Sequence, residues 1–521
     1  MLSLRYLIAK NEHNSFIVSY SINHDDVCFT LKVLKNCYGE QMFAKKILKL
    51  FSTVAISTSL MCAAAEDIVL PDIGTAGIRG LSIQREKQIG DYFMRKSRGT
   101  MAFVEDPVLG EYLRSIGGKL VMNAKDVRFP FEFFLVNNPY LNASAFLGGK
   151  VMVHTGLFHY CDTEDEFASV LAHEISHVTQ RHLARYIEDM EQKAPLTTAG
   201  LIGSIAMAIL NPMIGLASLS TTMGVSTQSS INFTRDNEYE ADRIGIGVLA
   251  RAGFNPEGMV QLFRKLMAMQ GNVNPAFVML MDHPLSETRV AEAQGRLTQY
   301  KARANSKNPD FLLAKARVEV RYMNTDLKQL KERLVANPDN LSATYRNYAL
   351  ALICYEQKQY GEALEYLGSL GSLQNNMFVI DLRTDIDLKT GRASSAAARL
   401  EGLYAKRPKN EAVTINLGNV YLESGNYKNG VKVLSKFTTA QPGNILAHSI
   451  LSELYGRSGD RCNALQSKAT VYFLKAQYQQ ATALYNQALG ICRDKYSREI
   501  IKAKIVQTSE QKRFDEYLEK G

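Results

Sequence analysis

The chain has 521 residues, a net charge of +9 at pH 7, 46% hydrophobic residues and 22% charged residues. This length is too great for one ordinary hydrophobic core, so we expect two to four domains of a soluble globular protein. The positive charge excess is small, and no basic stripe with interleaved aromatic residues occurs. Nucleic-acid binding is therefore not expected.

The N-terminal region contains the pattern of a secretory signal peptide at residues 42–65. Three lysines precede a twelve-residue apolar run, Leu50 to Met61, and three alanines that offer a cleavage site follow it. Twelve residues are too few to span a bilayer as a helix. We expect export to the periplasm. Residues 1–41 are then either an over-long reading of the gene, with translation starting at Met42, or a genuine N-terminal extension.

Export to an oxidising compartment permits disulfide bonds. Cys462 and Cys492 lie near the start of one expected helix and just past the end of the next. The ends of an antiparallel helical hairpin meet in space, so we expect a disulfide between these two cysteines. Two unpaired buried thiols are the alternative.

Residues 163–191 predict a single helix that begins with Thr163 as its N-cap. His173 and His177 are four residues apart and so share one face, with Glu174 beside the first histidine. Two histidines and an adjacent carboxylate are what metal-assisted amide hydrolysis requires, since the carboxylate takes a proton from water and passes it to the leaving amine. The sequence predicts a zinc site with Glu174 as general base and acid, while His182 is expected to face elsewhere.

A second helix-like run supplies the expected third ligand. Glu238 and Asp242 are four residues apart on one face of this run, and Glu240 points away from them. A two-histidine, one-glutamate site with water as fourth ligand is a catalytic zinc pattern. Asp242 is suited to hold a histidine ring in its correct tautomer. A solvated acidic face is the alternative for both carboxylates.

Four segments in order, "NASAFLGGKVMVHTGLF", "AHEISHV", "NEYEADRIG" and "MDHPLSETR", resemble the membrane-associated zinc metallopeptidase family that includes HtpX and the CAAX prenyl proteases. The resemblance covers roughly residues 70 to 300. It is closest to exported, periplasmic members that carry helical repeats. It implies one zinc ion per subunit, held by His173, His177 and Glu238, with Glu174 as catalyst and Asp242 in support.

The resemblance also implies that His283 occupies the fourth zinc position and holds the enzyme inactive. From the sequence alone, His283 is equally a loop histidine or a transition-state donor. Arg289, six residues on, is either an anion-stabilising partner in the transition state or a plain surface arginine.

The strand around Val151 follows a glycine pair and alternates apolar with polar residues. This pattern predicts an exposed edge strand beside the zinc helix, to which an unfolded substrate adds as an extra strand. The residues of this expected substrate strand are Asn142, Ala143, Gly148, Gly149 and Val151.

An uncharged stretch from Ala194 to Thr234 separates the two metal motifs. We expect residues 195–234 to form a partly apolar lid over the cleft, in peripheral contact with a membrane or a partner. A membrane-inserted hairpin is the alternative, although the apolar run before Asn211 is only about half of a roughly 20-residue span.

The second half of the chain has turn residues at a regular interval. Gly391, Gly425 and Gly459 are 34 residues apart, as are Pro408 and Pro442. Thirty-four residues is the period of the tetratricopeptide helix-turn-helix repeat, whose units stack into a superhelix with a concave binding surface.

We therefore expect an α+β zincin-type metallopeptidase domain, mostly helical with a small sheet, at residues 66–305. An all-α tetratricopeptide superhelix follows at residues 306–521. The favoured function is a periplasmic zinc endopeptidase with chaperone-like activity. The resemblance implies misfolded or stalled outer-membrane proteins as substrates and the outer-membrane assembly machinery as partner of the repeats.

Two other functions are compatible with the sequence. One is a non-cleaving chaperone or scaffold, in which His283 keeps the zinc site closed and the repeats bind partners. The other is a zinc-stabilised structural domain, which is disfavoured because structural zinc sites are usually closed and rich in cysteine.

Overall fold

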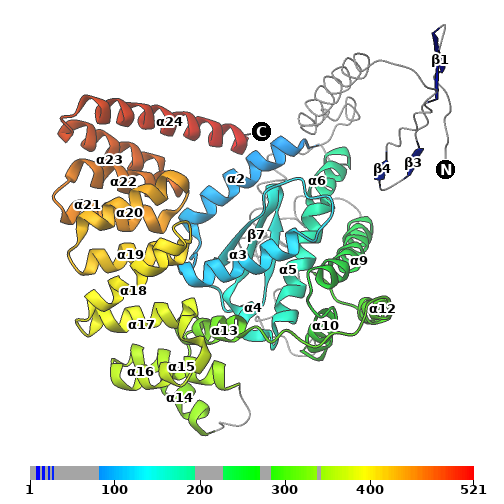
Figure 1. Cartoon of the computed structure of the whole chain (residues 1–521), viewed down its shortest axis with the longest axis horizontal. Coiled ribbons are helices and arrows are strands. Elements are labelled where there is room, and N and C mark those ends of the chain that lie inside the picture. Colours follow the sequence, from blue (N-terminus) through cyan, green and yellow to red (C-terminus); the bar gives the residue numbers. More distant parts are fainter. Residues whose placement is uncertain are drawn as a thin grey trace. The chain divides into compact units, whose positions relative to one another are not determined.

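The computed structural model describes four short strands near the N-terminus and residues 81–193, 227–269, 283–336 and 342–520 (Figure 1). The expected signal peptide and most of the uncharged stretch, up to residue 226, lie outside the described residues. No helix among the described residues is both long and apolar enough to cross a bilayer.

The four N-terminal strands belong to a separate unit, Met1–Ile78. They form two antiparallel hairpins, β1 (Ile8–Asn11) with β2 (Asn14–Ile17) and β3 (Ser21–Asn23) with β4 (Asp26–Cys28). The second unit, Arg79–Gly521, contains both the sheet with its helices and the helical repeats.

A three-stranded sheet lies within the first half of the second unit. Its central strand is β7 (Lys150–His154), with β5 (Glu132–Val136) parallel on one side and β6 (Ala143–Phe146) antiparallel on the other. Every residue of β7 is buried. The prediction of an edge strand at Val151 is wrong, because both sides of that strand are paired; β5 and β6 are the edge strands of the sheet.

Gly148 and Gly149 form the turn between β6 and β7, and so are not part of a substrate-binding strand. Both have positive φ angles, 71° and 78°, which glycine adopts without strain. A Cβ atom on Gly148 would lie 2.8 Å from the Cα atom of Lys87. The glycine pair therefore lets the turn pass closely beneath the helix that carries Lys87.

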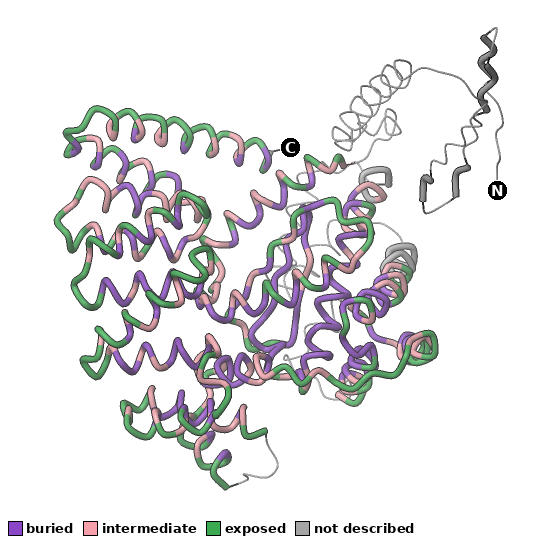
Figure 2. The backbone as a smooth tube through the Cα atoms, in the orientation of Figure 1, coloured by how far each residue is buried: buried purple, intermediate pink, exposed green. Residues whose placement is uncertain are grey.

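The helices of this region are α2 (Ile83–Thr100), α3 (Pro107–Val121), α4 (Thr155–Tyr160), α5 (Glu164–Thr179), α6 (His182–Lys193), α9 (Thr227–Arg251), α10 (Glu257–Met269) and α12 (Glu287–Arg296), with 3-10 turns at Leu147–Gly149 and Leu297–Gln299. Some of them lie next to the sheet, and others, α9, α10 and α12, lie beyond α5 (Figure 1). Helix α3 packs against β5, and α5 packs against β6 and α9. Nearly all of α5 is buried (Figure 2), so its side chains are held by packing on several sides.

The helix predicted over residues 163–191 is two helices. Helix α5 ends at Thr179, Arg181 has a φ angle of 55°, and α6 begins at His182. The Arg181 guanidinium holds this reversal, because Nε donates to Glu86 Oε1 over 2.7 Å and Nη2 donates to the Leu81 carbonyl over 2.5 Å. The chain therefore leaves the helical path just after the metal motif.

The repeat region consists of successive helices joined by short turns (Figure 1). They are α13 (Pro309–Arg321), α14 (Leu327–Ala336), α15 (Ala343–Glu356), α16 (Tyr360–Gly368), α17 (Met377–Lys389), α18 (Ala393–Lys406), α19 (Glu411–Glu423), α20 (Tyr427–Ala440), α21 (Ile445–Arg457), α22 (Arg461–Leu474), α23 (Tyr478–Ile491) and α24 (Lys495–Lys520), with a 3-10 turn at Gly371–Asn375. From α14 onward, neighbours along the chain pack against one another, while α13 packs on α15. The predicted fold class, a helical domain with a small sheet followed by all-α repeats, is confirmed.

The 34-residue glycine spacing marks the ends of equivalent helices. Gly391, Gly425 and Gly459 follow α17, α19 and α21, and each has a φ angle between 76° and 85°. A residue in this left-handed conformation ends a helix and turns the chain into the next one.

Cys462 in α22 and Cys492, which follows α23, are joined by a disulfide, with their Cα atoms 5.3 Å apart. Cys161 and Cys354 are free and buried. The bond ties the start of one helix to the end of the next.

The repeats contact the helices near the sheet through ion pairs. Arg317 of α13 lies 2.6 Å from Asp106, the N-cap of α3, and 2.6 Å from Asp381 of α17. At the other end of the repeats, Arg95 of α2 lies 2.6 Å from Asp515 of α24. Charged contacts thus link the first and last repeat helices to the region that carries the metal motif.

Candidate metal centre

Helix α5 positions the first two predicted ligands. Its N-cap, Thr163, accepts a hydrogen bond from the Glu166 backbone over 3.2 Å, and the Glu166 side chain accepts one from the Asp162 backbone over 2.8 Å. These bonds satisfy backbone donors at the start of the helix. The rings of His173 and His177 follow two and three turns later, on one face.

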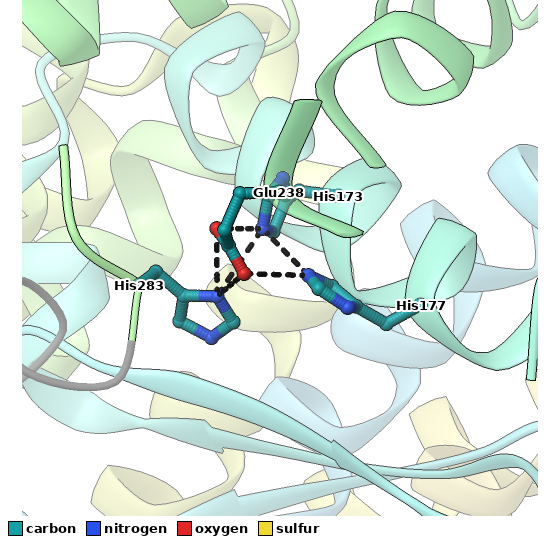
Figure 3. Close-up of side chains that lie close together, drawn as sticks. All are labelled: His173, His177, Glu238 and His283. Atoms are coloured by element: carbon teal, nitrogen blue, oxygen red, sulfur yellow. Dashed lines mark hydrogen bonds and ion pairs between the residues drawn. The ribbon is translucent and has the colours of Figure 1, made fainter. Parts of the chain in front are cut away.

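The four side chains His173, His177, Glu238 and His283 point toward one another (Figure 3). Each offers one ligand atom, and these atoms all lie within 4.8 Å of one another. The two Nε2 atoms of His173 and His177 are 2.9 Å apart, and the Glu238 carboxylate oxygens lie 3.3 Å and 3.4 Å from them. Helix α9, which packs on α5, brings Glu238 to this point.

The structure also brings His283 into this cluster. Its Nδ1 atom lies 3.3 Å from His173 Nε2 and 3.0 Å from Glu238 Oε1, while its Nε2 atom lies 3.4 Å from Glu174 Oε1. The ring therefore stands between the ligand carboxylate and the predicted catalytic carboxylate. Local sequence does not determine the position of this ring, since His283 lies in a segment outside α5 and α9, the helices that carry the other clustered residues.

Glu174 is buried beside the cluster. Its carboxylate accepts a backbone hydrogen bond from Ala145 in β6, while its Oε1 atom has no hydrogen-bond partner among the described residues. Burial raises the pKa of this carboxyl above its usual range. A raised pKa suits a group that accepts and then returns a proton near neutral pH.

Glu238 differs from Glu174 in its charge environment. Burial by itself would raise the pKa of Glu238, but the imidazoles of His283 and His173 hold it well below its usual range. Glu238 therefore stays ionised, as a ligand carboxylate must.

Asp242 and Arg289 contact the clustered residues His173 and Glu238. Asp242 Oδ1 lies 3.0 Å from His173 Nδ1. The Arg289 guanidinium donates to Asp242 through Nε and Nη2, over 2.7 Å and 2.9 Å, and its Nη1 lies 2.9 Å from Glu238 Oε2. Arg289 is buried. It is therefore not a surface arginine, and its donors hold two carboxylates of the site, so this arrangement does not support a direct contact with the transition state.

His182 and Glu240 also belong to the site, although the sequence pattern placed both elsewhere. His182 Nδ1 lies 2.8 Å from His177 Nδ1, and His182 Nε2 lies 3.0 Å from Glu240 Oε2. A continuous helix would carry His182 away from His177. The reversal at Arg181 returns it instead, and a left-handed arginine has no sequence signature that would have revealed this.

A cavity lies beside His173 and His283. Apart from Ser169, these two histidines and Arg289, its lining is apolar: Val170, Met259, Leu262, Phe263, Leu266 and Leu285. These side chains come from α5, α10 and the segment before α12. An apolar cavity therefore adjoins the cluster.

The donor set fits a zinc ion. Imidazole nitrogens with one carboxylate oxygen are ligands that zinc accepts. Each of the two helical histidines has a further contact at Nδ1, so its Nε2 atom is the one that faces the cluster. The buried Glu174 Oε1 atom makes no hydrogen bond among the described residues, so this carboxylate is free to act on a molecule bound beside the cluster.

The helical fold, the clustered ligands and the adjacent glutamate define the class of protein as a metallopeptidase. The family model described as Peptidase family M48 matches residues 108–297, and a tetratricopeptide repeat model matches residues 387–454. The chain belongs to peptidase family M48.

Its relatives include proteins named "Beta-barrel assembly-enhancing protease". That of Yersinia pestis is 39% identical over 81% of this chain and 88% of its own length, and that of Escherichia coli (strain K12) is 39% identical over 80% and 86%. The "Mitochondrial metalloendopeptidase OMA1" of Schizosaccharomyces pombe is 30% identical over 32% of this chain and 46% of its own length. The predicted family resemblance is confirmed.

Proposed function

We propose that this metallopeptidase is a periplasmic, zinc-dependent endopeptidase with chaperone-like activity that degrades misfolded or stalled outer-membrane proteins. The observation that carries the zinc-peptidase part is the convergence of His173, His177 and Glu238 beside Glu174. The names of the relatives support β-barrel proteins as the substrate class. The signal-peptide pattern at residues 42–65 supports export.

In this proposal each residue has a defined task. Zinc, when bound, supplies a Lewis acid that polarises the scissile carbonyl and acidifies water. Glu174 accepts the proton of the attacking water and returns it to the leaving amine. Asp242 orients the ring of His173, and Arg289 holds Asp242 and Glu238 in place.

Substrate binding is proposed at β6 rather than at β7. Strand β6 is one of the two edge strands, and its Ala145 backbone contacts Glu174. A chain that adds along β6 therefore passes next to the proposed catalytic carboxylate. Asn142 lies just before β6 and Ala143 is its first residue, so both belong to the proposed binding edge. Main-chain pairing of this kind favours unfolded chain over any one side-chain sequence.

The test compares an outer-membrane β-barrel protein in its unfolded and folded forms as substrates of the purified, zinc-loaded chain. We expect cleavage of the unfolded form, little cleavage of the folded form, and loss of cleavage after zinc is removed by a chelator. Zinc-bound protein that cleaves neither form would contradict the endopeptidase proposal. Equal cleavage of both forms would contradict the proposed substrate class.

His283 is proposed to hold the resting enzyme closed. Its contacts with Glu238 and Glu174 support this, because a substrate carbonyl and the attacking water need the same space. We expect the His283→Ala variant to cleave casein about tenfold faster or more, since an open minor state commonly holds on the order of 10% of molecules or fewer. The initial rate at matched zinc content measures this.

The control for that variant is His448→Ala, which removes a histidine of α21, in the repeats, and should leave the rate unchanged. A His283→Ala variant that retains zinc but cleaves more slowly than wild type would show that His283 assists the reaction. The closed-state role would then be abandoned.

The contacts of His283 also favour a second function, a non-cleaving chaperone or scaffold that acts through its repeats. A Glu174→Gln variant separates the two. If it supports assembly of a β-barrel protein in a reconstituted membrane assay as well as wild type does, the chaperone function is independent of cleavage.

A further inference from the structure

His177, one of the four clustered side chains, is connected through His182 to Glu240 of helix α9. His177 Nδ1 lies 2.8 Å from His182 Nδ1, and His182 Nε2 lies 3.0 Å from Glu240 Oε2. The His182 side chain is only 4% exposed. A buried imidazole between a ligand ring and a carboxylate is costly to maintain unless both of its nitrogens are used, and here both are.

The hydrogen-bonding capacities of these groups fix where the protons lie. An ionised carboxylate only accepts, so the Nε2 atom of His182 donates to Glu240. The Nδ1 atom of a neutral His182 ring then carries a lone pair, which accepts a hydrogen bond from the Nδ1–H group of His177. His177 is left with its lone pair on Nε2, the atom that lies 2.9 Å from His173 Nε2 inside the cluster.

The other ligand histidine has a carboxylate next to its Nδ1 atom. His173 Nδ1 faces Asp242, 3.0 Å away. Outer contacts of this kind orient a ligand ring and select its tautomer, and losing one commonly weakens metal binding by about 10- to 100-fold. His177 needs such support more than His173 does, because it lies in the last turn of α5 and its side chain is 15% exposed, against 4% for His173.

We propose that His182 and Glu240 are positioning residues that hold His177 in the orientation and tautomer of a metal ligand, as Asp242 does for His173. This inference rests on the proposed zinc site. The reversal of the chain at Arg181 brings His182 into reach, and Arg185, 2.8 Å from Glu240 Oε2, fixes that carboxylate.

Zinc affinity of the full chain, measured by competition with a chromogenic chelator, tests this proposal. We expect His182→Ala to raise the zinc dissociation constant by about 10- to 100-fold. His182→Gln should retain most of the affinity, because its amide can donate to Glu240 and accept from His177. Glu240→Ala should weaken binding in the same direction, while Glu292→Ala, which removes a surface carboxylate of α12, should not.

Two further readouts separate positioning from general stability. The visible absorption of the cobalt-substituted protein should change in His182→Ala and return toward wild type in His182→Gln. The double variant His182→Ala with Glu240→Ala should lose little more affinity than His182→Ala alone, because both residues act through the same ring.

The outcomes also distinguish this inference from the zinc site on which it rests. Zinc bound by wild type and lost in His177→Ala upholds the site, and the His182 variants then decide the inference. If those variants bind zinc as tightly as wild type and give the same cobalt spectrum, the positioning role is overturned. If wild type itself binds no zinc, both proposals fail together.

Discussion

Replacing Glu174 with glutamine is expected to lower kcat for casein cleavage by about 10²- to 10⁴-fold, the usual contribution of a positioned general base and acid. Glutamine has nearly the same size and shape but cannot take up the proton of the attacking water. Zinc content, measured by atomic emission on the same samples, should remain at the wild-type value, because Glu174 is not one of the four clustered ligand residues. Measuring kcat and zinc content together distinguishes activity lost with the proton carrier from activity lost with the zinc ion.

The matched control is Glu292→Gln, the same substitution at a surface position of α12. It should cleave at the wild-type rate. If Glu174→Gln cleaves within a few-fold of wild type, Glu174 is not the proton carrier. If it loses zinc, the variant has disturbed the site, and the loss of activity says nothing about proton transfer.

Replacing Arg317 with methionine is expected to lower the free energy of unfolding by about 3–5 kcal/mol, the cost of leaving a buried charge without its partner. Arg317 is 3% exposed, Asp106 is 6% exposed and Asp381 is 3% exposed. Methionine fills much of the volume but leaves two buried carboxylates without their cation. Because Asp106 caps α3 and Asp381 lies in α17, the loss should loosen the packing of the repeats against the peptidase region.

Urea unfolding followed by circular dichroism gives this free energy. Arg457→Met serves as the control, since Arg457 and its partner Glu453 are 64% and 54% exposed and such pairs contribute about 1 kcal/mol or less. Adding Asp106→Asn and Asp381→Asn to Arg317→Met should recover part of the stability, because no unpaired charge is then buried. An Arg317→Met variant as stable as Arg457→Met would contradict the role of this ion-pair network.

The central part of the metal cluster could be predicted from the sequence because the helical period sets it. Residues four apart share a face on any α-helix, so His173 with His177, and Glu238 with Asp242, needed no knowledge of the tertiary structure. The 34-residue glycine spacing predicted the repeats for the same reason, since each glycine ends an equivalent helix. Local periodicity and turn chemistry are properties of the chain itself.

The tertiary structure decided what depends on contacts between distant segments. Strand order is such a property, because the same residue pattern is compatible with a central strand, as β7 is, and with an edge strand, as β6 is. His182 joined the site because Arg181 adopts a left-handed conformation that Glu86, far away in the sequence, helps to hold. Arg289 and Arg317 are buried cations whose partners lie in other parts of the fold. The residues that flank them in the sequence do not distinguish them from surface arginines. Sequence patterns record short-range geometry, and only the folded chain determines which charges and edges it buries.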